Sequence, residues 1–301
     1  MGTPEFAVPT LETLLHHRYL IPAVVTAPDK PRGRGQQMSP TPVKQTALQH
    51  HLSVLQPESL RDPEFVKQVR ELQPDLIVVV AFRVLPKEIF TIPPSGSINL
   101  HASLLPRYRG AAPINWAIIN GETETGVTTF FLEEKVDTGN VLLRRSVPIG
   151  PEEDAGSVHD TLARVGAEVV LETVRLIEQG KASPQPQDNS LASPAPKIFK
   201  DDCRIRWDQP ARSVYNFVRG LSPHPAAFTV HDGKVIKIFR TAITDRGAAT
   251  PGEIDVEGES LSVSVADRQL AVLELQQEGK KRMATAEFLR GYRLRSGERF
   301  L

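Results

Sequence analysis

Apolar runs alternate with amphipathic stretches along the first 180 residues, and this pattern predicts strands separated by helices. The clearest strand is 75–82, whose Leu-Ile-Val-Val-Val-Ala centre is typical of a strand buried on both faces. Thr3 and Asp62, each followed by a proline, are typical helix caps. The pattern therefore predicts βαβ units and an α/β fold with a mostly parallel, doubly wound sheet. We expect strands at 21–26, 53–56, 75–82, 97–101, 126–132 and 141–148, and helices from about Pro4 to Leu15 and at 43–51, 62–72, 86–90, 112–120 and 154–179.

The second half of the chain has a different pattern. Residues 181–203 are rich in Pro, Ser, Gln and Asp and have little periodicity, which is typical of a linker. After them, a helix and a series of short strands separated by Gly or Asp turns predict a small β-barrel. We therefore expect a first domain at 1–180, a linker at 181–203 and a second domain at 204–301. The expected elements of the second domain are a helix at 211–220, strands at 226–231, 234–240, 251–257, 260–265 and 270–276, and a short helix at 285–291.

Charge is balanced over the whole chain but uneven along it. Lys and Arg together number 36, as do Asp and Glu, so a globally basic nucleic-acid binder is not indicated. Residues 280–301, however, contain seven Lys or Arg and two Glu, and residues 30–44 contain four basic residues and no acid. These segments are either local basic surfaces that attract phosphates or ordinary solvated surface.

The composition also excludes several classes of site. The single cysteine, Cys203, rules out an internal disulfide and a cysteine-rich metal site, and we expect no bound metal. No Gly-x-Gly-x-x-Gly motif follows a predicted strand, so a dinucleotide-binding fingerprint is absent. No apolar run reaches the ~18 residues of a membrane span. We therefore expect a soluble, cytoplasmic protein.

One predicted strand end carries the side chains best suited to chemistry. Asn99 and His101 alternate with apolar residues, so a strand at 97–101 would place both polar side chains on one face. An amide beside an imidazole can hold a carbonyl oxygen and move a proton. Asp137 lies in the polar loop 133–140 and would orient the imidazole if it reached His101. Together the three predict acyl transfer without a metal or a covalent intermediate, although spacing alone leaves a structural role for His101 open.

The residues around this site resemble a known family. The segments Ile98–Ile114, Glu124–Thr128 and Asp137–Gly139 are similar to the 10-formyltetrahydrofolate-dependent formyltransferases. Further segments narrow the resemblance to the branch that formylates methionyl initiator tRNA, and together they cover essentially the whole chain. These segments are Met1–Pro9, Ala27–Gly35, Ser39–Lys44, Ile205–Asp208 and Arg219–Phe228.

The resemblance implies a fold, a reaction and a catalytic trio. It implies a Rossmann-like catalytic domain with the formyltransferase fold and a small OB-like β-barrel domain. The reaction moves a formyl group from N10 of 10-formyltetrahydrofolate to the α-amino group of methionine on initiator tRNA, for translation initiation. Asn99 and His101 would stabilise the oxyanion, and Asp137 would support the charge on His101 and help to take the proton lost by the amine.

The resemblance also implies binding residues. Ser103, Leu104, Leu105 and Pro106 would line the folate site, with Phe82 and Arg83 at its edge. Initiator tRNA would contact two basic segments, and the protein would act as a monomer without a membrane partner. The expected tRNA-contacting residues are Lys30, Arg32, Arg34, Lys280, Lys281 and Arg282.

Two departures from the family pattern give further expectations. Family members usually carry an apolar strand ahead of the Met-Gly-Thr-Pro segment, so we expect the given start to be internal to the natural chain. The segment 81–86 is one residue shorter than the usual Ala-Tyr-Gly version, so we expect a different edge of the folate pocket. There, Arg83 would face either the glutamate tail of the folate or solvent.

Two other functions stay open. A formyltransferase acting on a nucleotide or an amino sugar is disfavoured by the second domain and by the basic, proline-rich loop that we expect at residues 28–42. A catalytically inactive RNA-binding module is disfavoured by the intact set of Asn99, His101 and Asp137.

Overall fold

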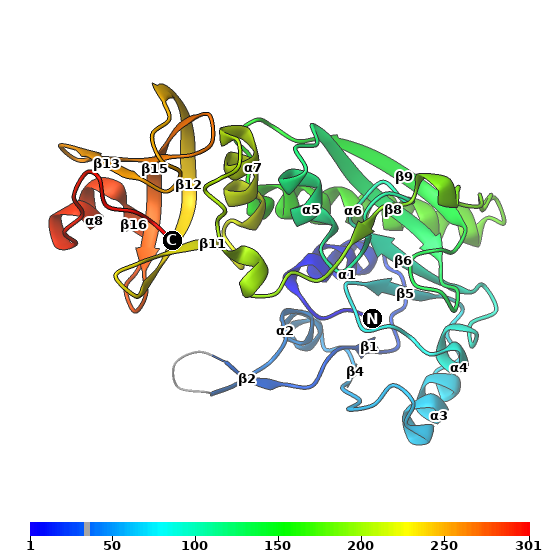
Figure 1. Ribbon diagram of the computed structural model, residues 1–301. Coiled ribbons are helices and arrows are strands. Elements are labelled where there is room, and N and C mark those ends of the chain that lie inside the picture. The colour runs from blue at the N-terminus through cyan, green and yellow to red at the C-terminus, as the bar shows by residue number, and fades with distance from the viewer. Residues whose placement is uncertain (33–36) are drawn as a thin grey trace. The chain divides into compact units, whose positions relative to one another are not determined.

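The computed structural model describes residues 1–32 and 37–301 and forms two compact units (Figure 1). Unit 1 comprises Met1–Gly110, Thr125–Val147 and His159–Pro194, and unit 2 comprises Ala111–Glu124, Pro148–Val158 and Ala195–Leu301. None of the helices in the described ranges is long and apolar enough to cross a membrane. The α-helices are α1 (Val8–His16), α2 (Pro42–Gln49), α3 (Pro63–Glu71), α4 (Lys87–Phe90), α5 (Pro113–Ile119), α6 (Ala155–Glu178), α7 (Ala211–Leu221) and α8 (Thr285–Gly291), with short 3-10 helices at Glu5–Ala7, Asn189–Leu191 and Asp201–Cys203.

Unit 1 has a mixed α/β architecture, which confirms the α/β class predicted from the sequence. In its four-stranded sheet the order is β5-β6-β8-β9; β5 and β6 run parallel, whereas β8 runs antiparallel to β6. A separate parallel pair is formed by β1 and β4. The predicted strand at 97–101 forms as expected. The strands whose residues lie mainly in unit 1 are β1 (Val24–Val25), β2 (Lys30–Arg32), β3 (Gln37–Ser39), β4 (Val54–Leu55), β5 (Ile77–Val80), β6 (Ser97–His101), β7 (Arg109–Gly110), β8 (Glu124–Phe131) and β9 (Val141–Pro148).

The first two residues connect the two sheets of unit 1. Gly2 forms a parallel bridge with Val80, and its N–H donates to the carbonyl of Val25 at 3.0 Å. Met1 and Gly2 thus lie between β1 and β5 in the manner of a strand. Beside them is a cavity of about 580 Å³, lined mainly by apolar residues of α1, β1 and β5 and of the segment 19–23. The sequence expectation about a longer natural chain stays a prediction.

Local sequence explains how α2 and α3 begin. Thr41 accepts a hydrogen bond from the backbone N–H of Lys44 at 3.1 Å, and Asp62 accepts one from Glu64 at 3.0 Å. Each of these N-caps is followed by a proline, which has no N–H to leave unpaired at the first helical turn. The stretch 28–42 was expected to be a loop, but β2 and β3 pair as a short antiparallel hairpin within it.

Unit 2 contains an antiparallel sheet packed on α7. Its strand order is β11-β12-β15-β14-β13, with β16 beside β15. Buried residues of α7 and of these strands form one hydrophobic core that also holds Trp207 and Phe300. Within the described residues, β11 and β13 are not paired, so a closed barrel is not observed. The strands are β10 (Pro194–Ala195), β11 (Ala227–His231), β12 (Lys234–Gly247), β13 (Ile254–Glu257), β14 (Ser260–Ser264), β15 (Arg268–Gln277) and β16 (Met283–Ala284).

The stretch predicted as a linker is anchored to unit 1 over part of its length. Gln185 and Val141 exchange two backbone hydrogen bonds of 2.8 Å, and the carbonyl of Ser193 accepts from the N–H of Arg109 at 2.9 Å. Low apolar periodicity marked this stretch as irregular. It contains only short elements, and its backbone hydrogen bonds hold it against the rest of unit 1. The expected domain boundaries themselves stay a prediction.

Candidate active site

Asn99 and His101 share one face of β6, close to the point where the strand ends. His101 is buried, with 7% of its surface exposed. Asn99 is half-buried, and within residues 1–32 and 37–301 its side-chain amide has no hydrogen-bond partner. An amide in this position can donate to a substrate oxygen, as the sequence hypothesis requires.

The chain after β6 is held in a compact turn by hydrogen bonds. Thr128 Oγ1 donates to the carbonyl of Ser103 at 2.6 Å and accepts from the N–H of Leu105 at 3.1 Å. Ser103 Oγ in turn donates to the carbonyl of Arg107 at 2.6 Å. Tyr108 follows with φ of 60°, in the left-handed region, so the chain turns back toward the strand it left.

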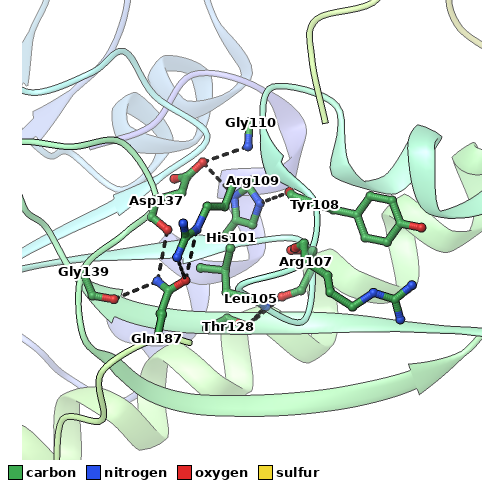
Figure 2. A network of polar contacts seen from close by, with 11 residues as sticks. His101, Leu105, Arg107, Tyr108, Arg109, Gly110, Thr128, Asp137, Gly139 and Gln187 are labelled. Atoms are coloured by element: carbon green, nitrogen blue, oxygen red, sulfur yellow. Dashed lines mark hydrogen bonds and ion pairs between the residues drawn. The ribbon is translucent and has the colours of Figure 1, made fainter. Parts of the chain in front are cut away.

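This turn fixes the tautomer of His101. The ring Nε2 lies 2.8 Å from the carbonyl oxygen of Tyr108 (Figure 2). A carbonyl oxygen only accepts hydrogen bonds, so Nε2 must carry a hydrogen. The neutral ring therefore has its lone pair on Nδ1, and any proton that His101 gains or loses is exchanged at that nitrogen.

Asp137 faces that same nitrogen. Its Oδ2 lies 3.9 Å from His101 Nδ1 and accepts a hydrogen bond of 3.0 Å from the N–H of Gly110 (Figure 2). The carboxylate side chain is 10% exposed, and the residue has φ of 56°. The structure thus brings Asp137 to His101 across 36 residues of sequence, which the sequence hypothesis required. The catalytic roles of the three residues stay a prediction.

Two polar residues beside Asp137 were not singled out from the sequence. The side chain of Gln187 contacts the loop of Asp137, and Arg109 contacts Gln187 (Figure 2). Arg109 lies within the segment that carries the family resemblance. Gln187 lies in the stretch interpreted as a linker, where the pattern gave no signal for it.

The expected folate residues are placed on two neighbouring segments. The side chains of Ser103, Leu105 and Pro106 are buried and that of Leu104 is half-buried, so this segment offers a ligand mainly its backbone. Phe82 packs against the core around β5.

Arg83 makes contacts within the chain that the sequence did not indicate. Its guanidinium donates to the carbonyls of Pro57 at 2.8 Å and Glu58 at 2.9 Å and lies over the ring of Phe82. The side chain therefore holds the 57–58 segment instead of facing open solvent. Its proximity to a folate tail stays a prediction.

The expected tRNA-contacting residues lie on two hairpins, one in each unit. Lys30 is exposed on β2, Arg32 lies on the same strand, and Arg34 falls outside the described residues. Lys280, Lys281 and Arg282 are exposed on the segment between β15 and β16. Two of these carry a counter-charge: Lys281 lies 3.6 Å from Glu287, and Arg282 donates to Glu274.

Among the residues that the structure describes, His, Cys, Asp and Glu side chains form no group of three that could hold a metal ion. The chemistry available here is that of an amide, an imidazole and a carboxylate, which can stabilise an oxyanion and transfer protons.

Comparisons with known proteins agree with this chemistry. Residues 2–174 match the formyl transferase family, and residues 197–293 match the C-terminal domain of formyl transferases. The chain is 50% identical over 301 residues to the methionyl-tRNA formyltransferase of Geobacter sulfurreducens, covering 99% of this chain and 95% of that protein. It is also 50% identical over 299 residues to the methionyl-tRNA formyltransferase of Citrifermentans bemidjiense, covering 99% and 94%.

A solved structure shares the fold at low identity. The N-formyltransferase from Helicobacter canadensis, in complex with folinic acid and dTDP-3-aminofucose, superposes with a TM-score of 0.68 at 20% identity, covering 90% of this chain and 96% of that one. Two family models match the two halves of the sequence, and two relatives are 50% identical to it, so the family of this chain is established. The chain belongs to the formyl transferase family and, within it, to the methionyl-tRNA formyltransferases.

Proposed function

We propose that Asn99, His101 and Asp137 carry out formyl transfer at the end of β6. The reaction is that of the methionyl-tRNA formyltransferases, in which 10-formyltetrahydrofolate gives its formyl group to the α-amino group of methionine on tRNA, for translation initiation. The observation that carries the proposal is the 3.9 Å separation between His101 Nδ1 and Asp137 Oδ2, with Nε2 already committed to the Tyr108 carbonyl.

The proposed sequence of steps follows from these groups. The neutral amine attacks the formyl carbon, and the carbonyl oxygen becomes an oxyanion that accepts a hydrogen bond from the Asn99 amide. Protonated His101 adds positive charge beside that oxyanion, and Asp137 supports the imidazolium. The attacking nitrogen loses its proton toward Asp137. Collapse of the tetrahedral intermediate breaks the bond between the formyl carbon and N10 of the folate, and N10 leaves with the proton that Asp137 took from the amine.

Two binding surfaces complete the proposal. The backbone of Ser103–Pro106 would hold the folate, with Phe82 and Arg83 at the edge of the pocket. The structure of the Helicobacter canadensis relative contains folinic acid, which supports the proposal that a protein with this fold binds a folate. The exposed Lys30 on the β2–β3 hairpin and the exposed basic residues at 280–282 would contact tRNA phosphates, as the excess of basic residues in both segments suggests.

The finer description of the fold also belongs to this proposal. Unit 1 would be a Rossmann-like domain, supported by the parallel pairs β1–β4 and β5–β6. Unit 2 would be an OB-like domain, which is supported by the antiparallel sheet of strands β11 to β15 and by the helix packed on that sheet. We also propose a cytoplasmic monomer, and light scattering of the purified protein tests the monomer.

The test is transfer of labelled formyl from 10-formyltetrahydrofolate to methionyl initiator tRNA. His101→Ala and Asp137→Asn should each lower kcat by about 10²- to 10⁴-fold. Full activity in either variant contradicts the assigned chemistry. An amino-sugar nucleotide offered as the acceptor should not be formylated, whereas preference for it would favour the alternative function. Tight tRNA binding without any transfer would favour an inactive RNA-binding module.

A further inference from the structure

Gln187 contacts the catalytic loop with both hydrogens of its side-chain amide. Its Nε2 donates to the carbonyl of Asp137 at 3.0 Å and to the carbonyl of Gly139 at 2.8 Å (Figure 2). The residue is half-buried, whereas Pro186 and Asp188 on either side of it are exposed. Gln187 is therefore the side chain by which this part of the 181–203 stretch holds the loop of Asp137.

The other end of the same amide is held by Arg109. Gln187 Oε1 accepts hydrogen bonds from Arg109 Nη2 at 2.6 Å and Nε at 3.2 Å. Because a guanidinium only donates, these contacts assign the oxygen and nitrogen of the amide without ambiguity. Arg109 Nη2 also donates to Asn189 Oδ1 at 2.9 Å. Both ends of the Gln187 amide are thus directed by hydrogen bonds.

The loop of Asp137 needs such support. Residues 133–136, which precede Asp137, are mostly exposed, and Asp137 itself has a left-handed backbone conformation with φ of 56°. The carboxylate accepts a hydrogen bond from the N–H of Gly110. Gly110 directly follows Arg109, so both ends of Asp137 are held from one short segment. The N–H of Gly110 holds the Asp137 carboxylate, and Arg109, through Gln187, holds the Asp137 backbone.

We propose that Arg109 and Gln187 are positioning residues that set the distance between Asp137 and His101. This inference rests on the proposed function. Gln187 fixes the carbonyl groups of Asp137 and Gly139, and Arg109 fixes Gln187. The contacts of both side chains lead to the loop of Asp137, so both act on the reaction through Asp137. A displacement of about 1 Å in a reacting group lowers the rate by up to about 10²-fold.

The first test compares Gln187→Glu with a matched control. The introduced carboxylate would keep one oxygen for Arg109. Its second oxygen would face the carbonyls of Asp137 and Gly139, and because all three oxygens only accept hydrogen bonds, both contacts to the loop would be lost. We expect kcat to fall by about 10- to 100-fold, with the KM values for tRNA and folate changed by less than about threefold. The control is Gln185→Ala, two residues earlier, because among the described residues the Gln185 side chain hydrogen-bonds only to Ser183. It should keep the kcat of the parent protein.

The second test is a double-mutant cycle, which a merely structural role would not satisfy. If Gln187 acts through Asp137, Gln187→Ala should lower kcat in the parent protein but have no further effect in the Asp137→Asn background. Arg109→Lys, which keeps the charge but removes the two-pronged contact, should show the same dependence. Thermal midpoints of all variants, measured beside activity, separate loss of folding from loss of positioning.

The outcomes distinguish this inference from the proposed function. If Asp137→Asn is inactive while Gln187→Glu and Arg109→Lys keep full kcat, the positioning role is wrong and the catalytic assignment stands. If Gln187→Ala lowers kcat by the same factor in the parent protein and in the Asp137→Asn background, the residue acts elsewhere and the inference is overturned. If Asp137→Asn itself is fully active, the proposed function fails first.

Discussion

In a protein that begins at Met1, the α-amino group of this residue should make the free energy of unfolding depend on pH. The amine is buried between β1 and β5, where it donates to the carbonyl of Val78 at 2.6 Å. Burial removes water from the ammonium form and lowers the pKa of this group from 8.0 to about 5. The unfolded chain exposes the same amine to water and restores its ordinary pKa.

The sign and size of the effect follow from this difference. Between pH 8 and pH 5 the unfolded chain binds a proton at this amine that the folded chain does not bind. The free energy of unfolding therefore decreases as the pH falls, by about 1.4 kcal/mol per pH unit and by about 4 kcal/mol over the whole interval. Above pH 8 both states are neutral at this site, and the contribution is constant.

The assay compares urea unfolding of two proteins at several pH values in this interval. The first is the present chain with Met1 retained, as verified by intact mass. The second carries about five added apolar residues ahead of Met1, which turn the amine into an amide that can still donate to Val78. Continuing the parallel register of Gly2 with Val80 would place the added residues beside β5 and in the adjoining cavity.

In the extended protein, the free energy of unfolding should lose the pH-dependent contribution of the Met1 amine. The extended protein should also be more stable at pH 8. Each apolar side chain that fills the cavity contributes about 1.5–3 kcal/mol. Groups other than the amine titrate equally in both proteins, so the difference between their pH slopes isolates Met1. Equal slopes for the two proteins would refute the argument, because they would mean that the amine is hydrated in the folded chain.

Three further changes have definite expected outcomes. Gly139→Ala places a Cβ 1.7 Å from the carbonyl oxygen of Phe131 and should destabilise the protein by about 1–3 kcal/mol in urea unfolding, and lower kcat. Burial raises the pKa of the Cys203 thiol, so a thiol reagent at pH 8 should label it only as fast as the protein unfolds. Lys44, bonded to Asp29 at 2.6 Å, joins the two ends of the β2–β3 hairpin, so Lys44→Ala should raise KM for tRNA by about two- to fivefold and leave KM for folate unchanged.

The sequence predicted those parts of the fold where local signals and burial agree. The strand at 97–101 and the helix begun by Asp62 and Pro63 form at nearly the expected positions, because the apolar period and the caps indicate the same boundaries. The β2–β3 hairpin within 28–42 was missed, since four prolines and two glycines there masked any alternation. Pairing of short strands depends on partners that a local pattern does not contain.

The same distinction applies to the site. Asn99 and His101 could be found because their two-residue spacing on a strand is a local property. The meeting of His101 with Asp137 was suggested by family resemblance, since nothing in the spacing of these residues required it. Gln187 could not be found at all, because its role depends on two backbone carbonyls and one guanidinium, contributed by segments 48 and more residues away.

The turn after β6 contacts His101 and Asp137 chiefly through its backbone. The carbonyl of Tyr108 holds His101 at Nε2, and the N–H of Gly110 holds Asp137 at Oδ2, the oxygen that faces His101. Both contacts depend on backbone angles, with φ of 60° at Tyr108 and 127° at Gly110. The second of these angles favours glycine. The segment therefore orients the imidazole and the carboxylate toward each other, in addition to any contact with folate, and this explains why the nitrogen that faces Asp137 is the one left free to exchange a proton.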